Sequence, residues 1–224
     1  MDFWTGELSF GLFLLLIILS NFVMIPISAE YTLGYMISVL FWFFMIVAGT
    51  LVIIKNKKYL YIILLFILFS LIIWIIGYNK DIFWIDILER ISQIFFTCIL
   101  LFFVLVKVFE GGVVNRSRII GSIAGYLLLG NLFYAVYLLI YVINGPSAFN
   151  IPDGNINIQL IYFSYTTLAT LGYGDITPAV YSAMAVSNVE AITGQLYPAI
   201  LIARLISLET AAKSNDNSNI TPNE

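Results

Sequence analysis

The stretch SYTTLATLGYGDITP, residues 164–178, interrupts an otherwise strongly apolar chain. It has two glycines two positions apart, an aspartate directly after the second glycine, and a proline three residues later. Long apolar runs lie on both sides of it, at residues 119–143 and 179–208. Inside a membrane, irregular backbone is tolerated only where protein buries it or where it lines a water-filled cavity. This stretch is therefore expected to line such a cavity.

The composition predicts an integral membrane protein. Of the 224 residues, 61% are hydrophobic and 10% are charged, whereas about a quarter of a soluble domain is charged. The net charge of -3 is too small to indicate a nucleic-acid partner. The chain has no histidine and one cysteine, Cys98, which lies inside an apolar run. A disulfide framework and a Cys/His zinc site are therefore excluded. An enzyme has almost no support, because without His and with this one Cys no nucleophile–base or metal constellation is found, and no organic cofactor is expected.

Six apolar runs are long enough to cross a bilayer, which requires about 20 residues. They lie at residues 8–27, 33–54, 59–77, 87–109, 119–143 and 179–208. A shorter run at residues 157–169 is rich in hydroxyl groups and is predicted to be a re-entrant helix. We therefore predict an all-α membrane protein with six transmembrane helices and one re-entrant helix.

The basic residues predict how the chain is oriented. Eight of the ten lie on one side of the predicted spans, and only Lys80 and Arg90 lie on the other. The eight are Lys55, Lys57, Lys58, Lys107, Arg116, Arg118, Arg204 and Lys213. Because basic loops stay on the cytoplasmic side, we expect a multi-pass protein of the cell membrane with both termini in the cytoplasm. Residues 144–178 then face outside, and residues 144–155, which are rich in turn formers, are expected to form an exposed loop.

The backbone of TLGYG suits a dehydrated cation. Gly172 and Gly174 can adopt positive φ without a steric penalty. If the backbone alternates between left-handed conformations at these glycines and right-handed conformations at Leu171 and Tyr173, successive carbonyl oxygens point to one side. Together with the Thr170 hydroxyl, these oxygens replace the water shell of a cation. One chain supplies one wall only, so a closed ring requires four chains.

The sequence TLGYGD, from Thr170 to Asp175, resembles the selectivity filter of the potassium channel superfamily, whose usual form is TVGYGD. The resemblance implies a selectivity filter, a homotetramer in the lipid bilayer, and K+ as the permeant ion. It implies that the ion sites are formed by Thr170, Leu171, Gly172, Tyr173 and Gly174.

The flanking runs extend this resemblance over about residues 113–209. The sequences RSRIIGSIAGYLLLGNLFYAVYLLI and NVEAITGQLYPAILIARL are similar to the outer and inner helices of a group of bacterial six-span channel proteins. Gly194 lies nineteen residues after Asp175, where channels of this superfamily often carry a hinge glycine. Pro198 should kink the same helix, either as a static bend or as part of that hinge.

The chain is predicted to have three parts. Residues 1–110 form a four-helix transmembrane sheath that resembles a voltage-sensor domain without gating charges. Residues 111–210 form the pore domain, and residues 211–224 form a disordered cytoplasmic tail. The paired glycines within residues 110–115 mark the first boundary, because glycine weakens a helix.

The fourth apolar run lacks the charges that a voltage sensor needs. Steep voltage dependence requires several charges per subunit that cross the membrane field. This run has Arg90 near one end and Lys107 at the other, with sixteen uncharged residues between them. We therefore expect weak or no voltage dependence, with both residues acting as interfacial anchors.

Glu190 is an ionisable residue at membrane depth and so a functional candidate. Two orientations are possible from the sequence. The carboxyl group can bond behind the re-entrant helix and brace the filter, with Ser164, Thr166, Thr167, Thr170 or Asn131 as donors, or it can face a central cavity. We favour the first and expect Gln195 to face the cavity. Near the filter, Tyr162 is expected to contact Asp175 and to form an aromatic cuff with Phe163.

The function predicted from the sequence is passive, potassium-selective conduction through a tetrameric pore. A poorly selective cation channel is the alternative within the same class. An ion-transporter subunit is a further alternative, although transporters tend to have internal repeats and several broken helices.

Overall fold

The computed structural model describes residues 7–24, 27, 43, 44, 47, 49, 57–77, 82–110 and 115–220. Most of these residues are helical, as the apolar runs predicted. The second apolar run, residues 33–54, falls mostly outside the described part of the chain. The centre of the glycine joint, residues 111–114, and the last four residues of the tail also lie outside it.

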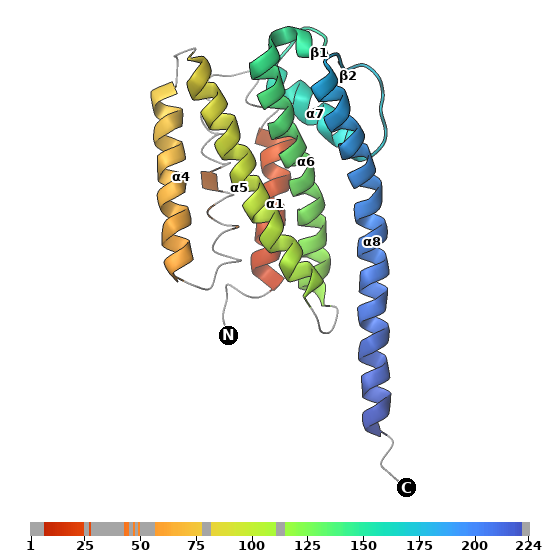
Figure 1. Cartoon of the computed structure of the whole chain (residues 1–224). Coiled ribbons are helices and arrows are strands. Elements are labelled where there is room, and N and C mark those ends of the chain that lie inside the picture. Colours follow the sequence, from red (N-terminus) through yellow and green to blue (C-terminus); the bar gives the residue numbers. More distant parts are fainter. Residues whose placement is uncertain are drawn as a thin grey trace.

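Three N-terminal helices correspond to the first, third and fourth apolar runs. Helix α1 spans Glu7–Leu19 and continues into a π-helical turn, η2, at Ser20–Met24. Helix α4 spans Lys57–Gly77, and helix α5 spans Phe83–Phe109. Both α1 and α5 pack against helix α6, which spans Arg116–Asn144, while α4 lies on the outer side of α5 (Figure 1).

The C-terminal part has the predicted order of a long helix, a short helix and a second long helix. After α6 come η3 (Gly145–Ala148), β1 (Phe149–Asn150), α7 (Ile156–Leu168), β2 (Thr177–Pro178) and α8 (Tyr181–Ile220). The short helix α7 has 13 residues, and each of its ends lies within one residue of the prediction. Its N-cap is Asn155, whose side-chain oxygen accepts a hydrogen bond from the Asn157 N–H at 3.0 Å.

Three helices in the described part of the chain are long and apolar enough to cross a membrane. They are Phe83–Phe109, Arg116–Ala148 and Tyr181–Leu208. Helix α7 is only about 20 Å long, too short to cross, as a re-entrant helix requires. The architecture is therefore that of an all-α membrane protein.

A continuous core joins the N-terminal helices to α6. Its fully or almost fully buried side chains come from α1, α5, α6 and the end of α7, and include Phe13, Phe96, Leu100, Val104, Leu128 and Leu168. Because lipid is as apolar as these side chains, close packing holds such helices together more than removal from water does. Helices α1 and α5 thus pack closely against α6 of the same chain.

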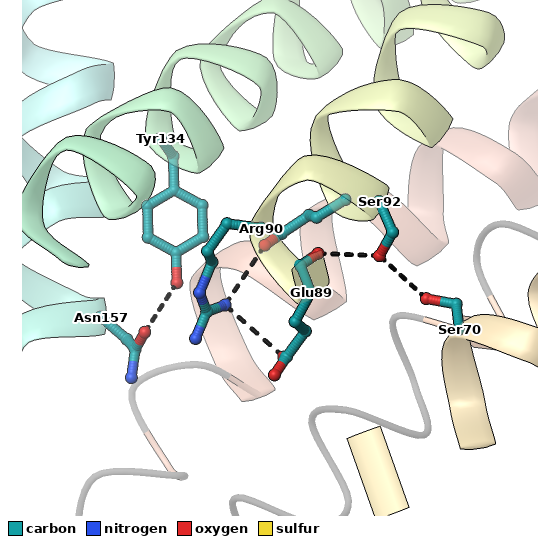
Figure 2. Close-up of polar contacts among 7 residues, drawn as sticks. Ser70, Glu89, Arg90, Ser92, Tyr134 and Asn157 are labelled. Atoms are coloured by element: carbon teal, nitrogen blue, oxygen red, sulfur yellow. Dashed lines mark hydrogen bonds and ion pairs between the residues drawn. The ribbon is translucent and has the colours of Figure 1, made fainter. Parts of the chain in front are cut away.

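Hydrogen bonds between helices add to this packing (Figure 2). Ser70 Oγ on α4 lies 3.0 Å from Ser92 Oγ on α5. The Tyr134 hydroxyl on α6 donates to Asn157 Oδ1 on α7 at 3.2 Å. Each of these bonds joins two helices, and in a membrane such a bond contributes about 0.6–2 kcal/mol.

The segment before α7 is pinned to the segment that follows the TLGYGD sequence. Strands β1 and β2 pair antiparallel, with Asn150 opposite Thr177. The Asn150 side chain donates to Thr177 Oγ1 at 3.0 Å, and the Ala179 N–H donates to Ala148 O at 2.9 Å. Ala148 and Phe149 are buried, so residues 144–155 are only partly the exposed loop that the turn formers predicted.

Helix α8 is longer than predicted. It has 40 residues, or about 60 Å at 1.5 Å per residue, and extends well past the other helices (Figure 1). The disordered tail predicted from Ala211 was wrong for residues 211–220, which continue the helix. Ala211, Ala212 and Lys213 have high helix propensity and extend α8 into the polar segment.

Candidate functional site

The TLGYGD loop, residues 170–175, follows the C-terminal turn of α7. The Leu171 N–H donates to Thr166 O at 2.8 Å, and the Gly172 N–H shares that carbonyl at 3.4 Å. The final carbonyl groups of a helix have no partner within the helix. Here the N–H groups of Leu171 and Gly172 in the loop are the partners of the Thr166 carbonyl, so the position of α7 determines the position of the loop.

The backbone of the TLGYGD loop has positive φ at every second position. Gly172 and Gly174 have φ values of 55° and 81°, as predicted. Thr170 has φ of 58° and is the only non-glycine residue in the described part of the chain with positive φ. A β-branched residue is unfavourable there. The hydrogen bonds on either side of this backbone turn run from the Thr170 N–H to Thr167 O at 2.9 Å and from the Leu171 N–H to Thr166 O at 2.8 Å. The first positive φ of the loop therefore lies at Thr170, two residues before Gly172.

One face of the TLGYGD loop is uncovered in the single chain. The side chains of Leu171 and Tyr173 are 59% and 67% exposed. A Cβ added to Gly172 or Gly174 would meet no atom within 4 Å among the described residues. This face therefore has room for further protein.

The predicted aromatic cuff contains Tyr162 but not Phe163. The rings of Tyr162 and Tyr173 are parallel, with an interplanar angle of 3° and centroids 6.3 Å apart. Phe163 instead packs on the buried side of α7, with its centroid 5.0 Å from that of Tyr137 and 5.7 Å from that of Phe149. Successive helical residues point about 100° apart, so two neighbours cannot both face the loop.

Asp175, the exposed acid at the end of the TLGYGD loop, interacts with Tyr162 as predicted. Desolvation and, next, a hydrogen bond to the Asp175 carboxylate raise the pKa of the Tyr162 hydroxyl above its ordinary value. At neutral pH the hydroxyl is therefore protonated and remains a donor to Asp175.

Behind α7, the carboxyl group of Glu190 joins three helices. Its Oε1 accepts from Ser164 Oγ on α7, and its Oε2 accepts from the Tyr137 hydroxyl on α6, each at 2.5 Å. All three side chains are fully buried. Glu190 thus contacts α7, as the favoured orientation predicted, and the cavity-facing orientation was wrong.

The partners of Glu190 are only partly those expected. Of the predicted donors, Ser164 bonds to it, whereas the Thr166 hydroxyl donates to Phe163 O at 3.0 Å instead. Asn131 is buried, and its Nδ2 has no hydrogen-bond partner among the described residues. Tyr137 was missed by the sequence reasoning.

A pattern in the sequence could have revealed Tyr137. Residues 126, 130, 134, 137 and 141 are Tyr, Gly, Tyr, Tyr and Tyr, which is the spacing of one face of a helix. In the structure this face of α6 lies against α7. A stripe of phenol groups facing a segment rich in hydroxyl groups indicates a polar interface.

Gly194, one turn after Glu190, permits α8 to approach the end of α7. A Cβ at this position would overlap the backbone carbonyl of Leu168. That carbonyl also accepts from the Tyr126 hydroxyl at 3.1 Å. Pro198, one further turn along, has no N–H for the Gly194 carbonyl. The structure therefore gives Gly194 a packing role, while its role as a hinge stays a prediction.

These elements agree with a comparison with known families. Residues 124–210, from within α6 to near the end of the apolar part of α8, match the family model described as ion channel. Neither the curated proteins nor the solved structures gave a significant match. Residues 124–210 are therefore similar to an ion-channel domain, and the expectation of a protein that is not an enzyme is confirmed.

Substitutions of Glu190 test the contact with Ser164 and Tyr137. Glu190→Gln retains an acceptor for Tyr137 and offers an N–H to Ser164, so the fold should keep nearly its full stability. Glu190→Val leaves two buried hydroxyl groups without this partner and should cost about 2 kcal/mol or more. Unfolding in detergent, followed by circular dichroism, measures the difference. Equal losses in the two variants would contradict the bracing contact.

Gly194→Ala tests the close approach of α8 to α7. The added methyl group overlaps the Leu168 carbonyl, so we expect a loss of about 1–3 kcal/mol. The matched control is Gly11→Ala in α1, where an added Cβ meets no described atom within 4 Å. Helix propensity alone should make that control stable or slightly stabilised. Equal unfolding midpoints for the two variants would argue against the packing role.

Proposed function

We propose that the protein is a potassium-selective channel in which four copies of the TLGYGD loop surround the conduction path. The observation that carries this proposal is the alternation of positive φ at Thr170, Gly172 and Gly174, in a loop held at the end of a short helix. The match of residues 124–210 to the ion-channel family supports it.

The chemistry is replacement of the ion's water shell by backbone oxygens. A residue with positive φ between residues with negative φ lets successive carbonyl groups turn toward the same side of the strand. The carbonyl oxygens of Thr170, Leu171, Gly172 and Tyr173, with the Thr170 hydroxyl, then form the principal K+ sites. Gly174 closes the outer end. Rings of carbonyl oxygens are the established means of K+ selection.

A homotetramer follows from the single loop in each chain. The uncovered face of the TLGYGD loop and the exposed apolar side chains of α8 support further chains on this side. The exposed residues of α8 include Val189, Ile192, Leu196 and Ile200. Four copies arranged around one axis cover these surfaces and close the ring of carbonyl groups. The predicted multi-pass topology, with both termini in the cytoplasm, belongs to this proposal.

The sheath, residues 1–110, is proposed to lack voltage sensing. Arg90 Nη1 donates to Gln93 Oε1 at 3.3 Å and lies 3.7 Å from Glu89 Oε1 (Figure 2). Lys107 Nζ donates to Glu110 Oε2 at 2.7 Å. Each cation on α5 thus has a partner within three residues on its own chain. Such local pairs support anchoring near the ends of α5 better than movement through the field.

Flux from liposomes tests the channel proposal. Purified protein should release K+ and Rb+ and exclude Na+, and Gly172→Ala should abolish this selective flux because alanine is strained at positive φ. Gly145→Ala is the matched control, since Gly145 also has positive φ, 71°, with no described atom within 4 Å of an added Cβ. The Gly145→Ala variant has the same kind of backbone strain, from alanine at positive φ, but at a position outside the TLGYGD loop.

Each outcome has a distinct meaning for the proposal. Equal flux of K+ and Na+ through the wild-type protein would favour the poorly selective cation channel. Flux that requires a second ion or a gradient of another solute would favour a transporter subunit. Gly172→Ala with normal selective flux would exclude the TLGYGD loop as the K+ site.

Voltage dependence tests the proposed sheath. With no charge between Arg90 and Lys107, open probability should change little between about −100 and about +100 mV in symmetric K+. Single-channel recording in planar bilayers measures it. A steep sigmoid that corresponds to several elementary charges would contradict the absence of a sensor.

A further inference from the structure

The first helix of the chain reaches the re-entrant helix directly. Asn21, in the π-helical turn η2, is buried, and its Nδ2 donates to the Tyr165 hydroxyl of α7 at 2.7 Å. The Phe22 ring packs beside the Tyr165 ring, with centroids 5.4 Å apart. These residues are 144 positions apart in sequence, so the contact joins the sheath to the pore part of the chain.

The geometry points to Asn21 as a positioning residue for ion selection, which acts by fixing Tyr165 and through it the turn of α7 that carries the TLGYGD loop. This role rests on the proposed function, because it presupposes a selective pore. Asn21 touches no permeant ion in this arrangement. Its effect passes through the Tyr165 side chain.

Tyr165 is held on two sides. Its hydroxyl donates to Leu127 O on α6 at 2.9 Å and accepts from Asn21, so both of its hydrogen-bonding functions are used. Its ring lies against Gly130, where an added Cβ would stand 2.6 Å from the ring. The ring cannot move toward α6, and η2 supplies a polar contact from the sheath. A π-helical turn is rare and occurs mostly at functional sites.

The turn that contains Tyr165 determines where the TLGYGD loop begins. The Tyr165 carbonyl accepts from the Ala169 N–H at 3.0 Å, and the next carbonyl, that of Thr166, accepts from the Leu171 N–H at 2.8 Å. A rotation or shift of α7 about Tyr165 therefore displaces the first carbonyl groups of the loop. Selection between K+ and Na+ depends on the arrangement of those groups.

The sheath contact is distinct from the Glu190 contact. Ser164, the residue before Tyr165, bonds to Glu190 on α8 and to Gly130 O on α6. Tyr165 bonds to η2 and α6. Neighbouring residues of one helical turn are thus held from different elements, and removing Asn21 leaves the bonds of Ser164 in place.

The test is the K+/Na+ permeability ratio of Asn21→Val, Tyr165→Phe and the double variant, measured in reconstituted channels. Asn21→Val should lower the ratio about fivefold, the size expected for one hydrogen bond. Tyr165→Phe, which also removes the bond to Leu127 O, should lower it at least as much. The double variant should be no worse than Tyr165→Phe alone, since Tyr165→Phe already removes the bond from Asn21. Ser92→Ala is the control, because it removes a buried hydrogen bond between α4 and α5 that does not reach α7. Its ratio should equal that of the wild type.

The outcomes separate this role from the proposed function. A selective wild-type channel whose ratio is unchanged in Asn21→Val overturns the positioning role alone. An equal loss in Ser92→Ala also overturns it, because general loosening of the sheath would then be sufficient. If Asn21→Val does not fold, Asn21→Ala, which removes the same donor and leaves the Tyr165 bond to Leu127 O in place, decides between the same results. A wild-type protein without selectivity overturns the proposed function, and the positioning role with it.

Discussion

The structure depends on how a helix of only 13 residues is held in place. An isolated helix of this length is marginal, so its stability must come from tertiary contacts. The carboxyl group of Glu190 supplies the central contact, since it bonds to Ser164 on α7 and Tyr137 on α6 while reaching from α8. The long helices on either side of the TLGYGD loop are thereby fixed to the helix that carries it.

The remaining contacts of α7 follow a common principle. Asn157, Ser164 and Tyr165 on α7 each bond to a hydroxyl, carboxyl or carbonyl group from another element, as burial at membrane depth requires. Tyr134 on α6 bonds to the start of α7, and Tyr165, near the end of α7, bonds to α6. Because Gly194 has no side chain, α8 can contact the carbonyl group of Leu168, the last residue of α7. A polar interface of this kind specifies one position for the helix, whereas apolar packing alone tolerates sliding.

Much of this arrangement could be predicted from local sequence patterns. The apolar runs predicted the described helices, and the glycines of TLGYG indicated positive φ at Gly172 and Gly174. Helix formation and backbone φ could be predicted because each depends mainly on nearby residues. The tyrosine spacing on α6 indicates a polar face that contains Tyr137, but neither the partner of Tyr137 nor that of Asn21 could be found in this way. Their partners lie 53 and 144 positions away, and no periodicity encodes such distances. The helical continuation past Ala211 was missed because a polar composition was taken to outweigh helix propensity.

The placement of α1 on the same chain's α6 and α7 has a consequence for mixed assemblies. The described contacts that support the TLGYGD loop from behind, including that of Asn21, come from the chain that carries the loop. If the proposed tetramer were built from two kinds of chain, each wall would therefore keep this support from its own chain. A defect in the first helix would act on one quarter of the ring, and its effect would rise stepwise with the number of altered chains.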